Sequence, residues 1–312
     1  MVIALEPTGD GQWHGVNGTD PGRRYLICAN GIEHQVCNWL IPADSTQSRC
    51  RSCRLNEVIP NLSSSTNLER WRALESEKRR LLHTLLCLDL PFEASNDGSH
   101  PGLSFAFLED QRTNPGVTED HVSTGHYRGV ITINVAEADS DYLEKTREQL
   151  NQPYRTLLGH FRHESGHYYW DRLIENTVWI EEFRNLFGDE RIDYEQALNN
   201  FYAAPSSDDW RENFVSAYAQ AHPLEDWAEC WAHFLHMTDT LETAREFDVG
   251  PPIPMEADFN EWVSTWVRIT VILNELNRSL GMRDPYPFVL TAPVVEKMRF
   301  IQSVISAASR TS

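Results

Sequence analysis

The stretch HFRHESGHYYW at residues 160–170 places three histidines around one glutamate. Within it, His163, Glu164 and His167 form the pattern H-E-x-x-H. On a helix, residues i and i+4 lie on the same face, so His163 and His167 can offer ring nitrogens to one zinc ion. Glu164 is turned by about 100° from His163, which places its carboxylate beside the metal rather than on it.

These residue types predict a hydrolytic reaction that uses metal-activated water. Zinc lowers the pKa of bound water to about 7, and a neighbouring carboxylate such as that of Glu164 can serve as base and then as acid. The alternative is an ordinary solvated helix rich in histidine. Gly166, which adds no bulk beside the metal, and an acidic segment further along the chain favour the metal site. We expect His160 to lie near this site or at the surface, not on the metal.

The acidic segment PLEDWAECWAHFLHM, at residues 223–237, is the best source of a third ligand. A catalytic zinc usually has three protein ligands and one open position. Glu225 and Glu229 are four residues apart and share a helix face, so one can bind zinc while the other accepts a hydrogen bond from a ligating histidine. We favour Glu225 as the ligand and Glu229 as the partner of a histidine. The spacing also permits the reverse, or Asp226 as a ligand.

Other side chains near this segment receive weaker assignments. Tyr218 precedes Glu225 by seven residues, and its hydroxyl could stabilise an oxyanion that forms on water attack. Packing in an aromatic core is the alternative for Tyr218. We expect His233 and His236 to be ordinary core or surface residues, although His233 could support a ligand, and Cys230 to be a small buried hydrophobe.

Four cysteines near the N-terminus predict a second, structural zinc site. Cys28 and Cys37 are followed by Cys50 and Cys53, and the last two have the C-x-x-C spacing of a zinc knuckle. Four thiolates close a tetrahedral site without an open position, so such a site supplies folding energy and does not catalyse. The first pair is more widely spaced than usual, and His34 could replace one cysteine; four free thiols are the alternative. The module could also dock a protein partner.

The composition limits the classes of partner. The chain has 312 residues, with 46 acidic against 27 basic side chains and a formal net charge of −19. This charge opposes binding to nucleic acid and to anionic membranes. The sequence shows no apolar run of the ~20 residues that a membrane span needs, and its first residues lack the features of a secretory signal. We therefore expect a soluble, cytoplasmic protein.

The pattern of apolar residues predicts a small N-terminal module, then a helix, a small sheet and a mostly helical remainder. We place the module at residues 1–62 and a second domain at residues 63–312. The expected strands are 103–108 and 126–135. The expected helices are 68–90, about 153–175 with Pro153 near its start, 177–187, 191–202, 208–221, 223–247, 257–280 and 293–308.

Together, the four cysteines, the H-E-x-S-G-H motif and the downstream P-x-E-D-W-A-E-x-W-A-H-x-L-H segment resemble the bacterial zinc-binding metallopeptidases that carry an N-terminal zinc ribbon. The resemblance extends from Cys28 to beyond His236. The central part also resembles the gluzincins of the anthrax lethal factor type, in which the first Glu of E-x-x-A-E binds zinc and a tyrosine lies seven residues earlier. Glu225, Glu229 and Tyr218 fall on those positions.

This resemblance implies an α+β, mainly helical zincin-like domain, with a small sheet over the active-site helix. The strand at 126–135 would then be the edge strand that aligns a peptide substrate. The segment 168–222 is long for this comparison, and we interpret it as a lid or an insertion that shapes the substrate site.

We therefore predict a zinc-dependent peptidase with one catalytic and one structural Zn2+, acting on peptides or proteins. The alternative is a catalytically silent, zinc-stabilised protein-binding module. A nucleic-acid-binding ribbon protein is a third hypothesis, which the net charge of −19 opposes.

Overall fold

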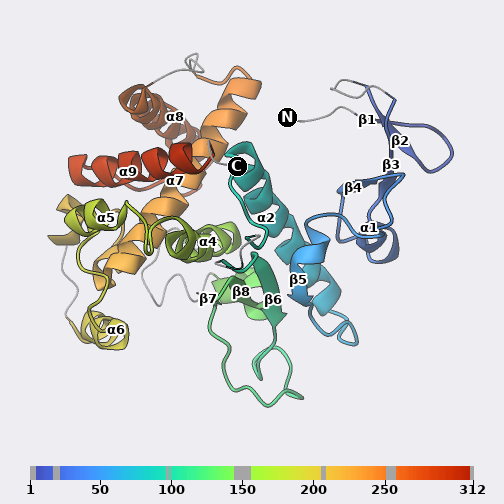
Figure 1. Ribbon diagram of the computed structural model, residues 1–312, viewed down its shortest axis with the longest axis horizontal. Helices are drawn as coiled ribbons and strands as arrows, with labels where there is room; N and C mark the ends of the chain where they lie inside the picture. The colour runs from blue at the N-terminus through green and yellow to red at the C-terminus, as the bar shows by residue number, and fades with distance from the viewer. Residues whose placement is uncertain are drawn as a thin grey trace. The chain divides into compact units, whose positions relative to one another are not determined.

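The computed structural model describes residues 5–16, 22–95, 98, 100–143, 156–204, 209–250 and 258–309. The protein is of mixed α/β type and about half helical. Figure 1 shows its helices and strands, which form two compact units. Unit 1 comprises Met1–Cys87 and Phe92–Thr146, and unit 2 comprises Leu88–Pro91 and Arg147–Ser312. None of the described helices is long and apolar enough to cross a membrane.

The N-terminal part of unit 1 is a small antiparallel sheet with the strand order β1-β2-β3-β4. Its strands are β1 (Leu5–Pro7), β2 (Trp13–Gly15), β3 (Arg24–Ile27) and β4 (Leu40–Pro42). The short helices α1 (Ala29–Glu33) and η1 (Cys53–Leu55) lie before and after β4 in the chain. The buried cluster here consists of four cysteines with Ile41, and Leu26 and Trp39 pack against it. So few apolar side chains form too small a core to hold a fold alone.

A second sheet in unit 1 has the order β5-β6-β8-β7. β5 (Asn56–Val58), β6 (Ser104–Leu108) and β8 (Val130–Asn134) are parallel, and β7 (Gly125–Tyr127) is antiparallel to β8. Parallel neighbours need a crossover connection. Between β5 and β6 this connection contains α2 (Asn67–Cys87), and the short helix η2 (Val135–Ala138) follows β8.

The expectation of a single edge strand at 126–135 was wrong. The stretch forms the hairpin of β7 and β8, joined by a two-residue turn in which Arg128 has φ of 47° and Gly129 has φ of 86°. Positive φ at both central residues is the geometry of the turn that favours two-residue hairpins. β8 lies between β6 and β7, so of the two hairpin strands only β7 is an outer strand of the sheet.

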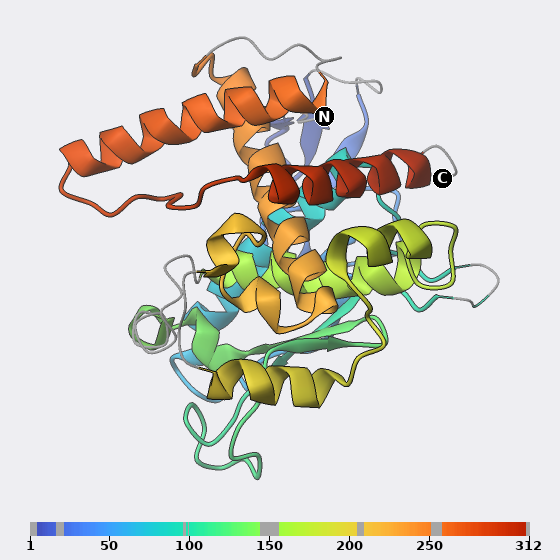
Figure 2. The same ribbon diagram turned by 90° about the vertical axis from the view of Figure 1, so that its left-hand side faces the viewer.

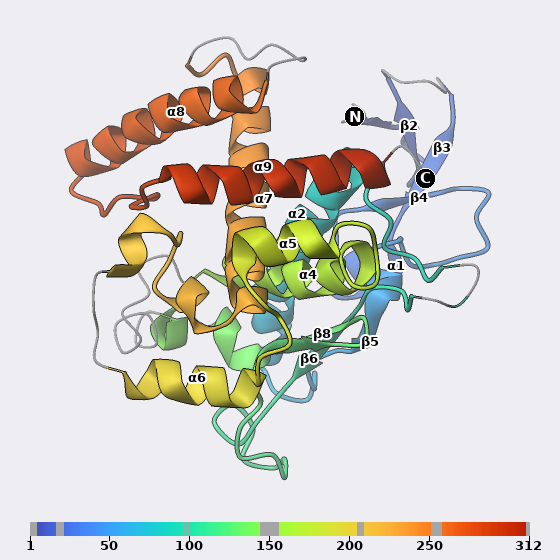
Figure 3. The ribbon, with the colours of Figure 1, turned by 60° about the vertical axis from the view of Figure 1, so that its left-hand side comes forward.

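Unit 2 is helical in its described residues. Its helices are α4 (Leu157–Leu173), α5 (Ile180–Phe187), α6 (Tyr194–Ala203), α7 (Pro223–Glu246), α8 (Phe259–Ser279) and α9 (Ala292–Ala308). α7 is the longest of them, and α4, α5 and α9 pack against it (Figure 2 and Figure 3). Side-chain caps fix the helix starts: Thr156 accepts a hydrogen bond at the start of α4, Asp193 does so for α6, and His222 does so for α7.

The expectation of a helix at 208–221 was wrong in its described part. This stretch forms two single-turn 3₁₀ helices, η3 (Asp209–Glu212) and η4 (Tyr218–Ala221). Because Pro223 disfavours helical dihedrals in the residue before it, His222 is extended, with φ of −160° and ψ of 151°, and α7 starts afresh after it. Pro153, expected near the start of α4, lies outside the described residues.

The contact between α4 and α7 depends on Gly166. A Cβ atom at this position would lie 2.9 Å from the Cα of Ala228, so the glycine lets the two backbones approach closely. Hydrogen bonds cross the same contact: Trp227 donates through Nε1 to the Gly166 carbonyl at 2.8 Å, and Trp231 donates to the Ser165 hydroxyl at 3.1 Å. Gly166 is therefore needed for helix packing.

We expect Gly166→Ala to lower the free energy of unfolding by about 1–3 kcal/mol, because the added methyl group forces apart two backbones that cannot rotate out of the way. The gain in helix propensity, about 1 kcal/mol, opposes this loss without cancelling the strain. Denaturant unfolding measures the difference. Gly125→Ala is the control, since no atom lies within 4 Å of the place that its new methyl group would occupy, and the stability should hardly change. Equal stability of both variants would contradict the prediction.

Candidate metal centres

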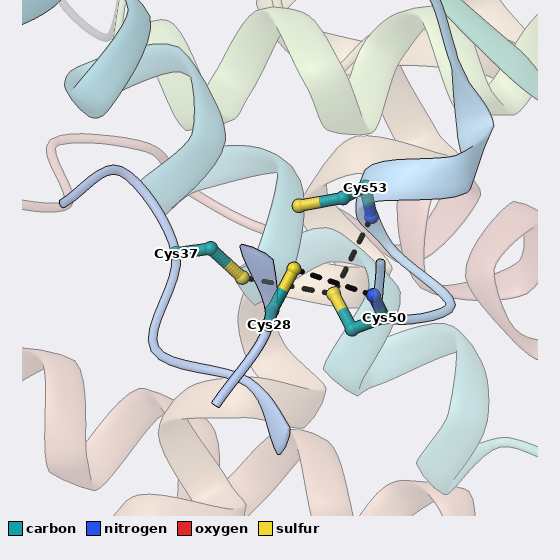
Figure 4. A group of neighbouring side chains, drawn as sticks. All are labelled: Cys28, Cys37, Cys50 and Cys53. Carbon is teal, nitrogen blue, oxygen red and sulfur yellow. Dashed lines mark hydrogen bonds between the residues drawn. The ribbon is translucent and has the colours of Figure 1, made fainter. Parts of the chain in front are cut away.

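The four N-terminal cysteines converge in one buried cluster, as Figure 4 shows. The sulfur atoms of the four cysteines all lie within 4.8 Å of one another. Those of Cys37 and Cys50 are 3.6 Å apart. All four thiols are free of disulfide bonds. Four convergent, buried thiols fit a zinc ion bound by four thiolates with no open position.

Backbone amides donate hydrogen bonds to the sulfur atoms of this cluster. Cys50 N donates to Cys28 Sγ at 3.3 Å, and Trp39 N donates to Cys37 Sγ at 3.4 Å. Such bonds favour the thiolate form that metal binding requires. The sulfur neighbours, Cys28 foremost, raise the pKa of the Cys53 thiol, because four negative sulfurs cannot share this space without a cation. His34 is not in the group; its ring lies 5.3 Å from that of Trp71, between centroids.

A second cluster in unit 2 joins α4 to the first turn of α7. His163 and His167, one turn apart on α4, meet Glu225, with the possible ligand atoms of all three within 4.8 Å of one another. The two Nε2 atoms are 3.2 Å apart. Glu225 Oε2 lies 3.0 Å from Nε2 of His163, and Oε1 lies 3.5 Å from Nε2 of His167. Two imidazoles and one carboxylate are thus brought together from segments far apart in the sequence.

The carboxylate of Glu225 shows that this cluster fits a metal ion. Its side chain is buried, and its Oε2 atom makes no hydrogen bond of good geometry within the described chain; it lies 3.0 Å from Nε2 of His163, with which it forms an ion pair when that ring is protonated. A buried carboxylate needs positive charge or hydrogen-bond donors around it, and at this site the candidates are the two imidazoles, the Tyr194 hydroxyl and a bound cation. A zinc ion among the three side chains would satisfy this oxygen and both inner nitrogens.

Glu229 occupies a different position, on the outer nitrogen of His163. His163 donates through Nδ1 to Glu229 Oε1 at 2.7 Å, so its Nε2, which faces Glu225, is the nitrogen available to a cation. The hydroxyl of Ser216 donates to the other oxygen of Glu229 at 2.6 Å. The spacing in the sequence did not distinguish the roles of Glu225 and Glu229. In the structure, Glu225 faces Nε2 of His163 and Glu229 faces Nδ1. Ser216 gave no signal in the sequence, because an isolated serine in a loop has many ordinary roles.

The two histidines differ in their charge states without a cation. Burial alone would lower the pKa of His163, but the carboxylates of Glu225 and Glu229 raise it well above its ordinary value. Burial lowers the pKa of His167 to about 4, so this ring is neutral at pH 7. Neutral imidazole is the form that binds metal ions.

Glu164, the expected general base, is buried beside this cluster on α4, with 7% of its surface exposed. Burial, aided by the charge of Glu225, raises the pKa of Glu164 to about 7, although His163 opposes the shift. A carboxyl group with a pKa near neutrality can both take and release a proton at physiological pH.

Two tyrosines approach the cluster. The ring of Tyr218, in η4, lies 6.0 Å from that of His163 between centroids, and burial raises the pKa of its hydroxyl, which stays protonated. Tyr194, at the start of α6, donates a hydrogen bond to Glu225 Oε1 at 2.5 Å. The sequence analysis missed Tyr194, since nothing in its local pattern connects it with a residue 31 positions later.

The structure places the remaining candidates away from the cluster. Asp226 accepts a hydrogen bond from Lys297 Nζ at 2.6 Å and so turns toward α9, and Cys230 is buried and donates to Asp226 at 3.6 Å. His233 bonds through Nδ1 with the Tyr286 hydroxyl at 2.8 Å. The ring of His236 packs edge-on against that of Trp266. His160 is partly buried.

The comparisons with known proteins match two consecutive parts of the chain. Residues 1–64 match a zinc-ribbon domain, and residues 67–304 match the family described as "Putative zinc-binding metallo-peptidase". Uncharacterized proteins from Mycobacterium bovis and Mycobacterium tuberculosis are each 41% identical over 287 residues, which cover 89% of this chain and 82% of theirs. No solved structure matches the chain. The family match covers three quarters of the sequence and includes every residue of the second cluster, so the chain belongs to this family of zinc-binding metallo-peptidases, preceded by a zinc ribbon.

Proposed function

We propose that the protein hydrolyses peptide bonds with a zinc ion held by His163, His167 and Glu225. The observation that supports this proposal is the convergence of the buried Glu225 carboxylate with two inner nitrogens: its Oε2 lies 3.0 Å from Nε2 of His163, and its Oε1 lies 3.5 Å from Nε2 of His167. When bound, zinc acts as a Lewis acid that polarises a carbonyl group and lowers the pKa of water. The family match supports a peptide or protein as the substrate.

The side chains of the protein then carry the proton transfers. Glu164 accepts a proton from the attacking water and delivers it to the nitrogen of the leaving amine. The protonated hydroxyl of Tyr218 donates a hydrogen bond to the oxygen that becomes negative as the carbonyl is attacked. Glu229 holds His163 through Nδ1, so that its inner nitrogen keeps its lone pair for the metal.

We assign this chemistry to a zincin-type domain at residues 63–312, with α4 as the active-site helix. The resemblance of the H-E-x-x-H and E-x-x-A-E segments to the gluzincins supports the assignment. The ribbon module at residues 1–62 holds a second, structural zinc ion through its four cysteines, whose sulfur atoms lie close together. The proposal therefore requires two zinc ions per chain.

Metal content and cleavage together test the proposal. We expect the wild-type protein to contain two zinc ions per chain and to cleave members of a broad peptide library. Glu225→Ala should retain one zinc ion and lose cleavage, because only the second cluster is broken. Glu182→Ala, which removes an exposed carboxylate of α5, is the control and should match the wild type. Elemental analysis and mass spectrometry of the library provide the two readings.

Two results would contradict the proposal. A single zinc ion that survives Glu225→Ala and disappears with Cys50→Ser would assign all of the metal to the ribbon. Two zinc ions without cleavage of any library member would favour the catalytically silent binding module instead.

A further inference from the structure

Tyr194 links helix α6 to the cluster of His163, His167 and Glu225. Its hydroxyl donates to Glu225 Oε1 at 2.5 Å. Its ring packs edge-on against that of His222, at 5.0 Å between centroids. His222 in turn caps the start of α7 and bonds through Nε2 with the Ile192 carbonyl at 3.2 Å. Tyr194 thus contacts both the carboxylate and the residue that starts the helix on which this carboxylate lies.

The hydrogen bond from Tyr194 gives the two oxygens of Glu225 different tasks. Oε1 accepts from Tyr194 and lies 3.5 Å from His167 Nε2, while Oε2 accepts no hydrogen bond of good geometry in the described chain and lies 3.0 Å from His163 Nε2. The terminal torsion of a glutamate has no sharp preference of its own. A fixed bond to one oxygen therefore decides where the other one points.

Glu229 provides the comparison within the same helix. One of its oxygens accepts from His163 Nδ1, and the other accepts from Ser216, whose hydroxyl in turn accepts a bond from the amide of Ala219 at 3.2 Å. Both oxygens of Glu229 are thus occupied, whereas Glu225 keeps one for a cation. The hydroxyl groups of Tyr194 and Ser216 separate the roles of two otherwise similar carboxylates.

We propose that Tyr194 is a positioning residue that holds Glu225 as a one-oxygen zinc ligand and thereby sets the zinc affinity of the catalytic site. This inference rests on the proposed function, because it assigns a task to a residue that contacts one of the proposed ligands. It also gives a role to α6, which contains no buried residue and belongs to the long segment between the two metal-binding helices. A carboxylate held through one oxygen leaves a coordination position open for water.

The test is Tyr194→Phe, which removes one hydroxyl group and keeps the ring against His222. Its control is Tyr202→Phe, which removes a phenolic hydroxyl from the same helix, where the residue is 63% exposed. Zn2+ affinity is measured by competition with a chelating dye, using protein whose ribbon already contains zinc, so that only the second equivalent is titrated. We expect Tyr194→Phe to bind this equivalent about 10–100-fold more weakly, as for other groups that orient metal ligands. Tyr202→Phe should match the wild type.

Thermal unfolding of the same samples separates positioning from simple support of the fold. The melting temperature is measured on protein whose second site is depleted of zinc. If Tyr194→Phe lowers the zinc affinity but leaves this melting temperature unchanged, the result supports the proposal. Wild-type zinc affinity in Tyr194→Phe overturns it, and so does a lower melting temperature without a change in affinity, since Tyr194 would then only dock α6. If wild-type protein binds no second equivalent at all, the proposed function itself fails, and this result is distinct from the other two.

Discussion

Glu164→Gln is expected to lower kcat/KM for peptide cleavage by about 10²–10⁴-fold while both zinc ions remain bound. The amide keeps the size of the side chain but cannot accept the proton of the attacking water. Glu164 does not belong to the group of possible ligand atoms formed by His163, His167 and Glu225, so its replacement should leave the metal content unchanged. Steady-state kinetics on the best library peptide and elemental analysis of the same preparation measure both effects.

The stability of this variant is an internal check. Burial raises the pKa of Glu164 to about 7, which means that folding disfavours its charged form. For a carboxyl group with a raised folded pKa, the associated stability is present at low pH and is lost as the pH rises through that value. A neutral amide avoids this cost, so with the second cluster depleted of zinc, Glu164→Gln should unfold at the same or a higher temperature than the wild type at pH 8. Glu175→Gln, an exposed position just beyond α4, is the control. Cleavage by Glu164→Gln at the wild-type rate would show that another group is the base.

Cys50→Ser is expected to release one zinc ion and to unfold the N-terminal sheet. Structural zinc sites of this kind contribute apparent binding free energies of about 10–16 kcal/mol, and much of that energy is folding energy. Strands of three or four residues and a core made chiefly of the cysteines themselves cannot replace it. Limited proteolysis should therefore cut the variant within residues 22–58, where we expect the wild type to resist.

Ser48→Ala is the matched control, because Ser48 is an exposed residue of the same segment and lies outside the four-cysteine cluster. It should keep two zinc ions and resist proteolysis. A Cys50→Ser protein that retained two zinc ions and the wild-type digestion pattern would show that the cluster is not a metal site.

Short-range spacing rules in the sequence predicted the histidine pair of α4 and the C-x-x-C pair among the four cysteines, whereas the choice of Glu225 as their distant partner also used the family resemblance. His163 and His167 share a face of α4 through their i, i+4 spacing. The helix itself was expected from the pattern of apolar residues on either side of the motif. The resemblance to the bacterial zinc-binding metallopeptidases that carry an N-terminal zinc ribbon was confirmed by the family match. The roles of the individual side chains stay predictions, although Glu225 and Glu229 contact different nitrogens of His163 as the preferred assignment requires.

Other features depend on contacts that no local pattern encodes. Tyr194 and Ser216 acquire their roles from residues brought near by the fold, and a tyrosine at the start of a helix gives no hint of this. The β7–β8 hairpin was misread as one strand because its turn has the sequence Arg128-Gly129 instead of the more recognisable Asn-Gly. The N-terminal strands, three or four residues long, are too short to display alternation.

The close approach of Gly166 to Ala228 has a consequence for how this protein can diverge. Each of these small residues adjoins a proposed functional position in the sequence, Gly166 next to His167 and Ala228 next to Glu229. Main-chain contact, not the choice of neighbouring side chains, thus sets the spacing between the histidine pair and the acidic pair. We expect that relatives can substitute many of the surrounding aromatic residues during evolution and still keep the same arrangement of the proposed metal ligands, as long as the residues at these two positions remain small.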